Sequence, residues 1–330
     1  MSGLILGIET SCDDTSVALV DRTGHVAAIR TVSQFEIHEA FGGVYPELAS
    51  RAHLEAILPT VEGVMAEASV TPSDLTAIGV TRGPGLIGSL LVGLATAEAL
   101  SMGWNVPAYG VNHLRGHIRS VELESGRTEF PAVIMLVSGG HTLIAELKDA
   151  WSYRLLGTTR DDSVGESYDK VARMLSLGMP GGPAIDRAAK LGTPVLRLPR
   201  PMKNEGYEFS FSGLKSSVAR HIEQHPEVSI EDMSASFVAA CVDVLTAKAD
   251  RALDECKPRS LVIVGGVAAS PQIRDAMTEV ANKYGVELCL PPMKWATDNA
   301  AMIAMATWDY VERGLQPDLM PKPNLSLETP

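Results

Sequence analysis

Short apolar runs bounded by turn residues alternate along the chain with longer segments whose apolar positions recur every three or four residues. The first pattern is typical of buried strands and the second of helices. The predicted strands are 4–9, 16–21, 25–32, 75–80, 107–111, 132–137, 143–148, 260–264 and 286–290. The predicted helices are 47–68, the segment from about 86 to 102, 113–117, 161–177, one beginning within 179–186, one following 209–215, 230–256, one from Pro271 and 298–313.

The predicted helix 47–68 carries a continuous apolar stripe at helical spacing, and we expect the whole stripe to be core. His38 lies before this helix and His53 lies within it. We interpret both as structural, because lone histidines seldom bind a metal without partners. The stripe consists of Leu54, Ile57, Leu58, Val61, Val64, Met65 and Ala68.

An arrangement of strand, polar turn and strand occurs twice, once from residue 4 and again from residue 132. The first turn, 10–15, is rich in hydroxyls and carboxylates, and the second, 138–142, contains two glycines. Such a repeat predicts an α/β fold of two related domains that each present a turn to a shared cleft. We place the domains at 1–131 and 132–299, with a C-terminal helix at about 300–330 that packs back on the first.

Composition narrows the class of protein. The 330 residues suit two domains, and 45% hydrophobic with 21% charged residues is ordinary for a soluble globular protein. The N-terminus shows no secretory signal, the uncharged stretch 83–97 is too short to span a bilayer, and four scattered cysteines fit a reducing cytosol. We therefore expect a cytoplasmic protein without a membrane partner. A net charge of −12 argues against a broad nucleic-acid surface.

Two histidines one helical turn apart are the main chemical signal. In a helix, His113 and His117 lie on one face, with about 5–6 Å between their Cβ atoms, so both imidazoles can reach one ion. Asp298, almost two hundred positions later, is the candidate third ligand, and we expect it to meet the histidines across the gap between the domains. The alternative is that the histidines are ordinary polar helix residues and Asp298 is only a helix cap.

Candidate substrate contacts lie in the second half. Ser138, Gly139 and Gly140 can present backbone amides to a phosphate. Asp169, Gly182 and Asp186 can accept hydrogen bonds from sugar hydroxyls, although without other context a solvated helix face and a tight turn explain them better. The segment 197–220 is the only basic-leaning region and is a candidate phosphate contact. Its basic residues are Arg197, Arg200, Lys203, Lys215 and Arg220.

In this order, these segments resemble one family, the tRNA N6-adenosine threonylcarbamoyltransferases, which have the fold of actin, chaperone ATPases and sugar kinases. The match extends from residue 7 to residue 299, and His141 together with 209–215 is similar to the bacterial and organellar branch. The motifs that carry the resemblance are Gly7-Ile8-Glu9-Thr10-Ser11-Cys12-Asp13-Asp14-Thr15, Asn112-His113-Leu114-Arg115-Gly116-His117, Val137-Ser138-Gly139-Gly140-His141-Thr142, Phe209-Ser210-Phe211-Ser212-Gly213-Leu214-Lys215, Gly265-Gly266-Val267 and Thr297-Asp298-Asn299.

The resemblance implies two duplicated actin-like (ribonuclease H-like) domains with an interdomain cleft. It also implies one divalent ion on His113, His117 and Asp298, with iron(II) ahead of zinc. Ser270 stands where the family has Asn, which leaves the nucleotide contact at that position open. The residues implied to hold threonylcarbamoyl-adenylate are Leu136, Val137, Ser138, Gly139, Gly140, Asp169, Gly182, Asp186 and Ser270.

The implied reaction is transfer of a threonylcarbamoyl group to the N6 amine of the adenosine next to the anticodon, in tRNAs that read codons starting with A. Spacing alone favours no general base among Glu9, Asp13 and His141. The implied partners are tRNA, threonylcarbamoyl-adenylate or ATP/AMP in the cleft, a homologous actin-like subunit and a small ATPase subunit of the bacterial type.

Three alternatives remain at this stage. An ATP-binding regulatory or scaffold protein could use the same cleft without chemistry. A metalloprotease of the helix type needs Glu directly after the first His, where this chain has Leu114. A kinase for sugars or small acids shares the fold, but paired histidines are not expected there.

Overall fold

A computed structural model describes residues 3–39, 41, 43–124, 127–225 and 227–329. The chain divides into two compact units. The first unit comprises Met1–Arg127 and Thr297–Pro330, and the second comprises Thr128–Ala296. Each unit contains one five-stranded sheet, and each is described by itself below.

The first sheet has the strand order β3-β2-β1-β4-β5. β1 pairs antiparallel with β2 and parallel with β4, β2 pairs antiparallel with β3, and β4 pairs parallel with β5. The carboxyl ends of β1, β4 and β5 therefore meet at one edge of the sheet. The strands are β1 (Leu4–Glu9), β2 (Asp14–Asp21), β3 (Val26–Ser33), β4 (Leu75–Gly83) and β5 (Ala108–Asn112).

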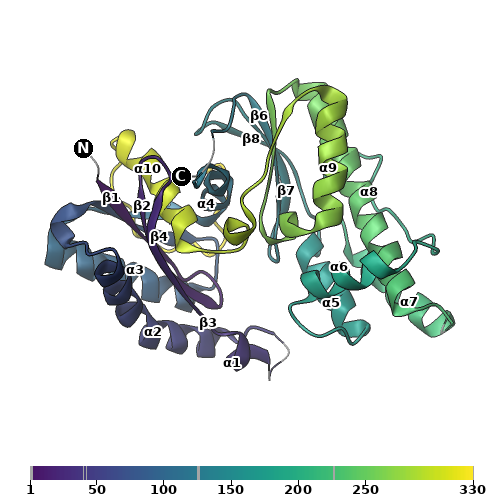
Figure 1. Ribbon diagram of the computed structural model, residues 1–330, viewed down its shortest axis with the longest axis horizontal. Coiled ribbons are helices and arrows are strands. Elements are labelled where there is room, and N and C mark those ends of the chain that lie inside the picture. Colours follow the sequence, from purple (N-terminus) through teal and green to yellow (C-terminus); the bar gives the residue numbers. More distant parts are fainter. Residues whose placement is uncertain (1–2, 40, 42, 125–126, 226, 330) are drawn as a thin grey trace. The chain divides into compact units, whose positions relative to one another are not determined.

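Helices cover both faces of the first sheet (Figure 1). α2 and α3 pack on one face, and α10 packs on the other against β1, β2 and β4. The helices are α1 (Phe35–Glu39), α2 (Pro46–Glu67), the 3₁₀ turn η1 (Pro72–Asp74), α3 (Ile87–Trp104), α4 (His113–Arg119), the 3₁₀ turn η2 (Ser120–Glu122) and α10 (Ala300–Glu312).

Two glycines let α10 lie directly on the sheet. A Cβ at Gly7 of β1 would overlap the backbone of Ala300, and a Cβ at Gly79 of β4 would overlap the hydroxyl of Thr307. The backbone N–H of Ala300 also donates to Ser16 Oγ of β2, at 3.0 Å. These contacts hold the N-terminus of α10, and with it the neighbouring Asp298, close to the edge where β1 ends.

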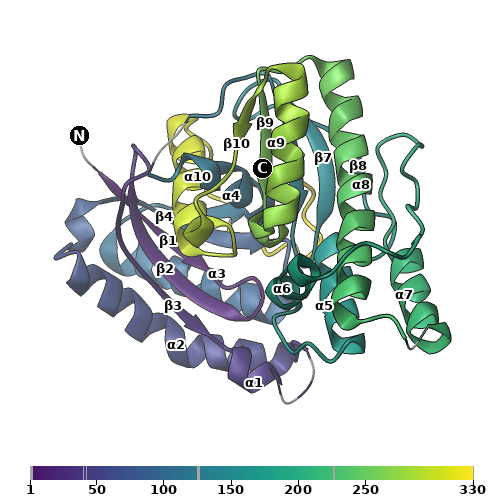
Figure 2. The same ribbon diagram turned by 45° about the vertical axis from the view of Figure 1, so that its right-hand side comes forward.

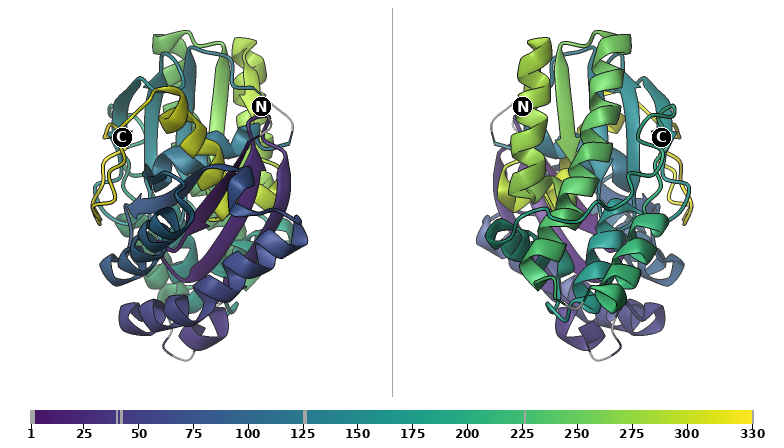
Figure 3. Two further views of the ribbon diagram at one scale, coloured as in Figure 1. Left: turned by 90° about the vertical axis from the view of Figure 1, so that its left-hand side faces the viewer. Right: turned by 90° about the vertical axis from the view of Figure 1, so that its right-hand side faces the viewer.

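The second sheet has the order β10-β9-β6-β7-β8. α8 and α9 run alongside its strands (Figures 2 and 3). Its strands are β6 (Ala132–Val137), β7 (Thr142–Leu147), β8 (Tyr153–Thr158), β9 (Ser260–Val264) and β10 (Glu287–Cys289). Its helices are α5 (Val164–Met174), α6 (Gly181–Leu191), α7 (Ser212–Gln224), α8 (Ile230–Cys256), η3 (Gly266–Ala269), α9 (Pro271–Tyr284) and η4 (Met293–Trp295).

The two sheets have the same connectivity. β6 pairs antiparallel with β7 and parallel with β9, as β1 does with β2 and β4. The third and fifth strands of each set also correspond, because β8 and β10 lie at the two edges as β3 and β5 do. The duplication predicted from the repeated strand–turn–strand pattern is therefore confirmed.

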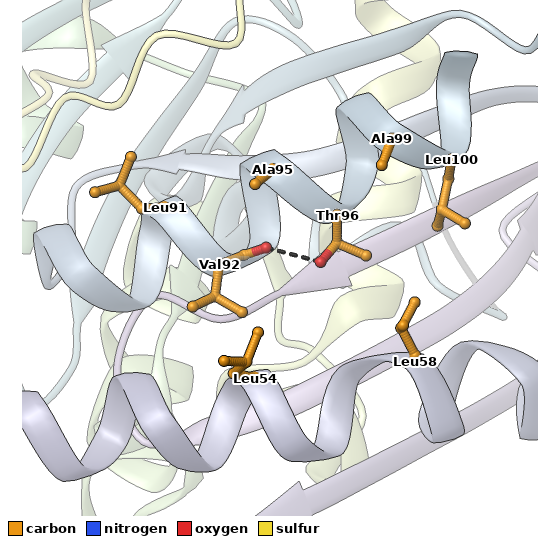
Figure 4. Close-up of a pocket in the computed structure, with 8 residues that line it drawn as sticks. All are labelled: Leu54, Leu58, Leu91, Val92, Ala95, Thr96, Ala99 and Leu100. Carbon is orange, nitrogen blue, oxygen red and sulfur yellow. Dashed lines mark hydrogen bonds between the residues drawn. The ribbon is translucent and has the colours of Figure 1, made fainter. Parts of the chain in front are cut away.

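The expected core stripe on α2 is only partly buried. Ile57, Val61 and Val64 are at most 2% exposed, but Leu54 is 68% exposed and Leu58 is 53% exposed. These two leucines face α3 across an apolar groove at the surface (Figure 4). Placing the whole stripe in the core was wrong, because periodicity marks an apolar face without showing how much of it the sheet covers. The groove is lined by Leu54, Leu58, Leu91, Val92, Ala95, Thr96, Ala99 and Leu100.

Some elements differ from those predicted. α1 and β8 were not predicted, since each is short and lacks a strong periodic signal. α10 begins at Ala300, and its N-cap is Asn299, whose side chain accepts from the Met302 N–H at 3.0 Å. Asp298 is therefore not the cap of this helix. By length and composition α3 is one helix apolar enough to cross a membrane, and about a quarter of it is buried in the first unit.

Candidate functional site

The histidine helix α4 starts directly from the end of β5. Asn112 is its N-cap, and the side-chain Oδ1 of Asn112 accepts from the Leu114 N–H at 3.0 Å. The Asn112 amide group also donates to the carbonyls of Ser326 and Thr329, at 2.8 and 2.9 Å. A capped helix start tied to the C-terminal segment gives His113, the first helical residue, a fixed position.

The structure brings His113, His117 and Asp298 together. One ligand atom from each lies within 4.8 Å of the others. His117 Nε2 is 3.0 Å from Asp298 Oδ1, and His113 Nε2 is 3.6 Å from the same oxygen. The two imidazole rings are nearly perpendicular, with centroids 4.7 Å apart. Two imidazoles and one carboxylate converging on one point are the donor set of a divalent transition-metal site with open positions.

The burial of these side chains also fits a metal. His117 is fully buried, and its Nε2, although 3.0 Å from Asp298 Oδ1, makes no hydrogen bond with the residues that the structure describes. Buried polar atoms without partners are rare, and each needs an explanation such as an ion. Asp298 is more open, with 37% of its side chain exposed. The cluster is therefore closed behind the histidines and accessible on the Asp298 side.

Asp298 belongs to the same compact unit as the histidines. The expectation that this carboxylate crosses a gap between two domains was wrong. The reason is the packing of α10 on β1, β2 and β4 of the first sheet, which places the residue before that helix beside the end of β1. The candidate metal centre is thus contained in the first unit.

The field at the cluster favours a cation. Burial disfavours the charged imidazolium of His113, but the carboxylates of Asp298 and Glu9 outweigh burial and raise the pKa of His113 to about 9. Burial alone would raise the pKa of Glu9, yet the interaction with His113 lowers it. The negative charge of these two carboxylates, one on each side of the His113 ring, would also favour a metal ion on Nε2, where the ion would replace the proton of the imidazolium.

The three candidate bases have different surroundings. Glu9, at the end of β1, is 1% exposed and lies with Oε2 at 2.9 Å from His113 Nδ1. Asp13 lies in the turn between β1 and β2 and is partly exposed. His141 is in the turn between β6 and β7, where its backbone N–H donates to Ser138 Oγ at 3.1 Å.

The predicted phosphate turn of the second unit is compact. Leu136 and Val137 are buried in β6, and the Ser138 N–H donates to the His141 carbonyl at 2.8 Å. Gly139 and Gly140 are exposed at its tip. Gly265, with φ +93°, lies so close that a Cβ there would contact the Val137 carbonyl and the Ser138 side chain. The turns after β6 and β9 therefore lie side by side.

The other predicted substrate residues form two pairs. Ser270 Oγ donates to Asp186 Oδ1 at 2.9 Å, and Asp169 Oδ1 accepts from the Gly181 N–H at 3.0 Å, beside the partly buried Gly182. Burial raises the pKa of Asp186 to about 6, although the hydrogen bond from Ser270 opposes this, and burial also raises the pKa of Asp169. Ser270 precedes α9 as expected, but its side chain does not cap that helix.

Part of the basic segment is already neutralised. Arg200 Nε is 2.9 Å from a carboxylate oxygen of Asp243, and Lys215 Nζ is 3.0 Å from one of Asp162. These pairs weaken the case for this segment as a phosphate contact.

Thr81 and Asn112 are site residues that we did not predict. Thr81 lies near the carboxyl end of β4 and bonds Glu9, while Asn112 ends β5. Both follow from the rule that functional side chains gather at the carboxyl ends of parallel strands. Applying that rule requires the strand order, which the sequence pattern alone does not provide.

Solved structures of other proteins share this fold. HypF from T. kodakarensis superposes with a TM-score of 0.67 at 15% identity, over 97% of this chain and 49% of that chain. The ROK hexokinase from Thermus thermophilus superposes with a TM-score of 0.52 at 15% identity, over 94% of this chain and 100% of that chain. Identities this low show the fold alone. Fold and site together define the class: a protein of two actin-like domains, the first of which carries a candidate metal centre.

The family follows from closer relatives. A profile of the tRNA N6-adenosine threonylcarbamoyltransferases matches residues 25–305. A protein with that name from Bacillus anthracis is 45% identical, over 98% of this chain and 96% of its own length. A second, from Carboxydothermus hydrogenoformans, is 46% identical, over 93% of this chain and 92% of its own length. The chain belongs to the tRNA N6-adenosine threonylcarbamoyltransferase family. The predicted family, fold and activity, an acyl transfer to adenosine in tRNA, are confirmed.

Proposed function

We propose that the chain transfers the threonylcarbamoyl group of threonylcarbamoyl-adenylate to the N6 amine of the adenosine next to the anticodon, in tRNAs reading codons that start with A. The observation that carries the proposal is the convergence of His113, His117 and Asp298 in a chain of this family. We assign one divalent ion to these residues, iron(II) ahead of zinc, since imidazole and carboxylate suit both.

The difficulty of the reaction lies in the nucleophile. The lone pair of the exocyclic amine is delocalised into the adenine ring, so catalysis depends on an activated donor, on positioning and on polarisation of the carbamoyl group. An ion held by the three ligands would supply Lewis acidity and an anchor for donor oxygens. Asp298 faces the accessible side of the cluster, and the buried histidines fix the position of the site.

We assign the nucleotide part of the donor to the second unit. The backbone amides of Ser138, Gly139 and Gly140 would bind its phosphate, and Leu136 and Val137 support this turn from the end of β6. Asp169, Gly182 and Asp186 would accept from ribose hydroxyls. Ser270, hydrogen-bonded to Asp186, would contact the nucleotide through its hydroxyl.

The general base is best sought in Asp13 and His141. Both lie in turns and are partly exposed, so their side chains can face a substrate. Glu9 is nearly inaccessible and already bonded to His113, which fits a role behind the metal site.

The alternatives account for the site less well. Between the two histidines stand Leu114, Arg115 and Gly116, all buried, so the carboxylate base of a helix-type metalloprotease is missing. An ATP-binding scaffold would need no metal ligands, and a sugar kinase would not need paired histidines.

We propose tRNA, a homologous actin-like subunit and a small ATPase subunit as partners in the cytoplasm. A net charge of −12 indicates that tRNA engagement needs help from another subunit. The apolar groove between α2 and α3 is a candidate contact for a protein partner, because its Leu54, Leu58 and Leu91 are exposed side by side. Tight tRNA binding by the purified chain alone at physiological salt would contradict this part.

The decisive experiment combines metal analysis of the purified chain with a transfer assay that supplies partner subunits, tRNA and pre-made threonylcarbamoyl-adenylate. We expect about one metal ion per chain and labelled threonine in the tRNA. A scaffold would show neither metal nor transfer. Transfer at full rate after complete metal removal would contradict the metal assignment.

A further inference from the structure

A buried carboxylate stands directly behind one of the two histidines. Glu9 ends β1, and 2% of its side chain is exposed. Its Oε2 lies 2.9 Å from His113 Nδ1, on the opposite side of the ring from Nε2, which faces Asp298. The ring of His113 therefore lies between two carboxylates, of which only Asp298 is accessible.

Glu9 is itself held by donors on both oxygens. Thr81 Oγ1 donates to Oε2 at 2.5 Å, and the Ser11 N–H donates to Oε1 at 2.5 Å. Ser11 Oγ, at 3.4 Å, is a much weaker neighbour of His113 Nδ1. Because β1 and β4 are parallel neighbours, Thr81 and Glu9 keep this register without flexible segments between them.

These contacts specify the tautomer of His113. A carboxylate that already accepts two other hydrogen bonds acts toward Nδ1 as an acceptor, so in the neutral ring the proton sits on Nδ1 and the lone pair sits on Nε2. An Nδ1–H donated to a carboxylate also makes the opposite nitrogen more basic. His117 differs, since its Nδ1 has no hydrogen-bond partner in the described part of the chain.

We propose that Glu9 is a positioning residue that fixes His113 as the Nδ1–H tautomer, so that Nε2 is presented as a metal ligand. The inference rests on the proposed function only through the metal site. It assigns Glu9 a role other than that of general base, and it makes Thr81 and Ser11 the groups that orient Glu9. Loss of such a partner lowers metal affinity by about 10–100-fold.

The test compares Glu9→Ala and Glu9→Gln with wild type and with Glu55→Ala, an exposed glutamate of α2 in the same unit. Affinity for Zn²⁺ is measured by competition with a chromophoric chelator, alongside the thermal midpoint. We expect an approximately 10–100-fold weaker affinity for Glu9→Ala. Glu9→Gln should lose less, because its amide oxygen can still accept from Nδ1–H. Glu55→Ala should match wild type.

A second readout needs no metal. Nitrogen-15 NMR of the histidine rings in the metal-free chain is recorded above about pH 10, where the His113 ring, with a pKa of about 9, is neutral. It should show His113 as the Nδ1–H form in wild type, and a shift toward the Nε2–H form in the variants. If Glu9→Ala fails to fold, the Zn²⁺ affinity of Glu9→Gln and the NMR spectra of wild type and Glu9→Gln test the inference. Unchanged affinity and an unchanged tautomer would overturn the inference. Absence of Zn²⁺ binding by wild type would instead contradict the proposed metal site, whatever the NMR result.

Discussion

The corresponding edges of the two sheets share one topology and carry different chemistry. In the first unit, the ends of β1, β4 and β5 bring Glu9, Thr81 and His113 together. In the second, the ends of β6 and β9 bring Ser138 and Gly265 together, so backbone groups and glycines replace ionisable side chains. The duplicated fold gives both edges the same geometry, and we propose that the residues at the strand ends suit the first edge to a metal and the second to a phosphate.

The largest expected effect comes from removing a ligand in the first unit. His113→Ala should cost the bound metal and lower transfer by about two orders of magnitude or more, the scale seen when an electrostatic stabiliser is lost. Metal analysis and the transfer assay measure both. His25→Ala, which changes an exposed histidine of the same unit, is the control. Near-wild-type transfer by His113→Ala would refute the ligand assignment.

A change at the second edge should affect the donor and leave the metal in place. In Gly265→Ala the new Cβ meets the Val137 carbonyl, and φ +93° is strained for any side chain. We expect the KM for threonylcarbamoyl-adenylate to rise about tenfold, equivalent to about 1.4 kcal/mol. Gly285→Ala, also at positive φ but in open space, controls for backbone strain alone. Loss of metal from Gly265→Ala would contradict the assignment of the metal to the first edge and the donor to the second.

A smaller effect is expected at Ser270. Ser270→Asn restores an amide that can donate to Asp186 and accept from a nucleotide at once. Donor affinity should be unchanged or a few-fold tighter, since one hydrogen bond contributes about 0.5–1.5 kcal/mol. Donor binding by calorimetry checks this. Complete loss of activity would show that Ser270 does not stand at the family's Asn position.

The smallest expected effect is on the pH dependence of the free energy of unfolding. The pKa of Asp186 is raised to about 6 by burial, so the folded state binds a proton more tightly than the unfolded chain does. This contribution to stability is present below about pH 4, the ordinary pKa of Asp, and is lost as the pH rises through 6. The substitution Asp186→Asn should therefore be more stabilising at pH 7 than at pH 4, by less than about 1 kcal/mol because the group is partly exposed. A difference that does not change with pH, measured by urea unfolding, would contradict the raised pKa.

Much of the fold follows from the sequence because its signals are local. The strand–turn–strand repeat and the apolar runs place β1, β2, β6 and β7, and the His-x-x-x-His spacing needs only one helical turn. Strand order is not local. Without it Glu9 could be proposed as a base, but its place behind His113 depends on β1, β4 and β5 being neighbours.

Two other differences between the predicted and the observed structure also arise from contacts between residues that are distant in the sequence. The position of Asp298 depends on α10 returning to the first sheet through close contacts at Gly7 and Gly79. The exposure of Leu54 and Leu58 depends on how far α3 covers α2. Neither is encoded in a window of ten or twenty residues.

The central claim is that one divalent ion binds at the edge of the first sheet through His113, His117 and Asp298. Its most direct test is X-ray absorption spectroscopy at the metal edge of the Zn²⁺-loaded chain, repeated on His117→Ala. We predict two imidazole nitrogens and at least one carboxylate oxygen around the metal, and loss of the bound metal in the variant. A metal bound through sulfur, or an identical spectrum from a fully loaded His117→Ala, would contradict the account.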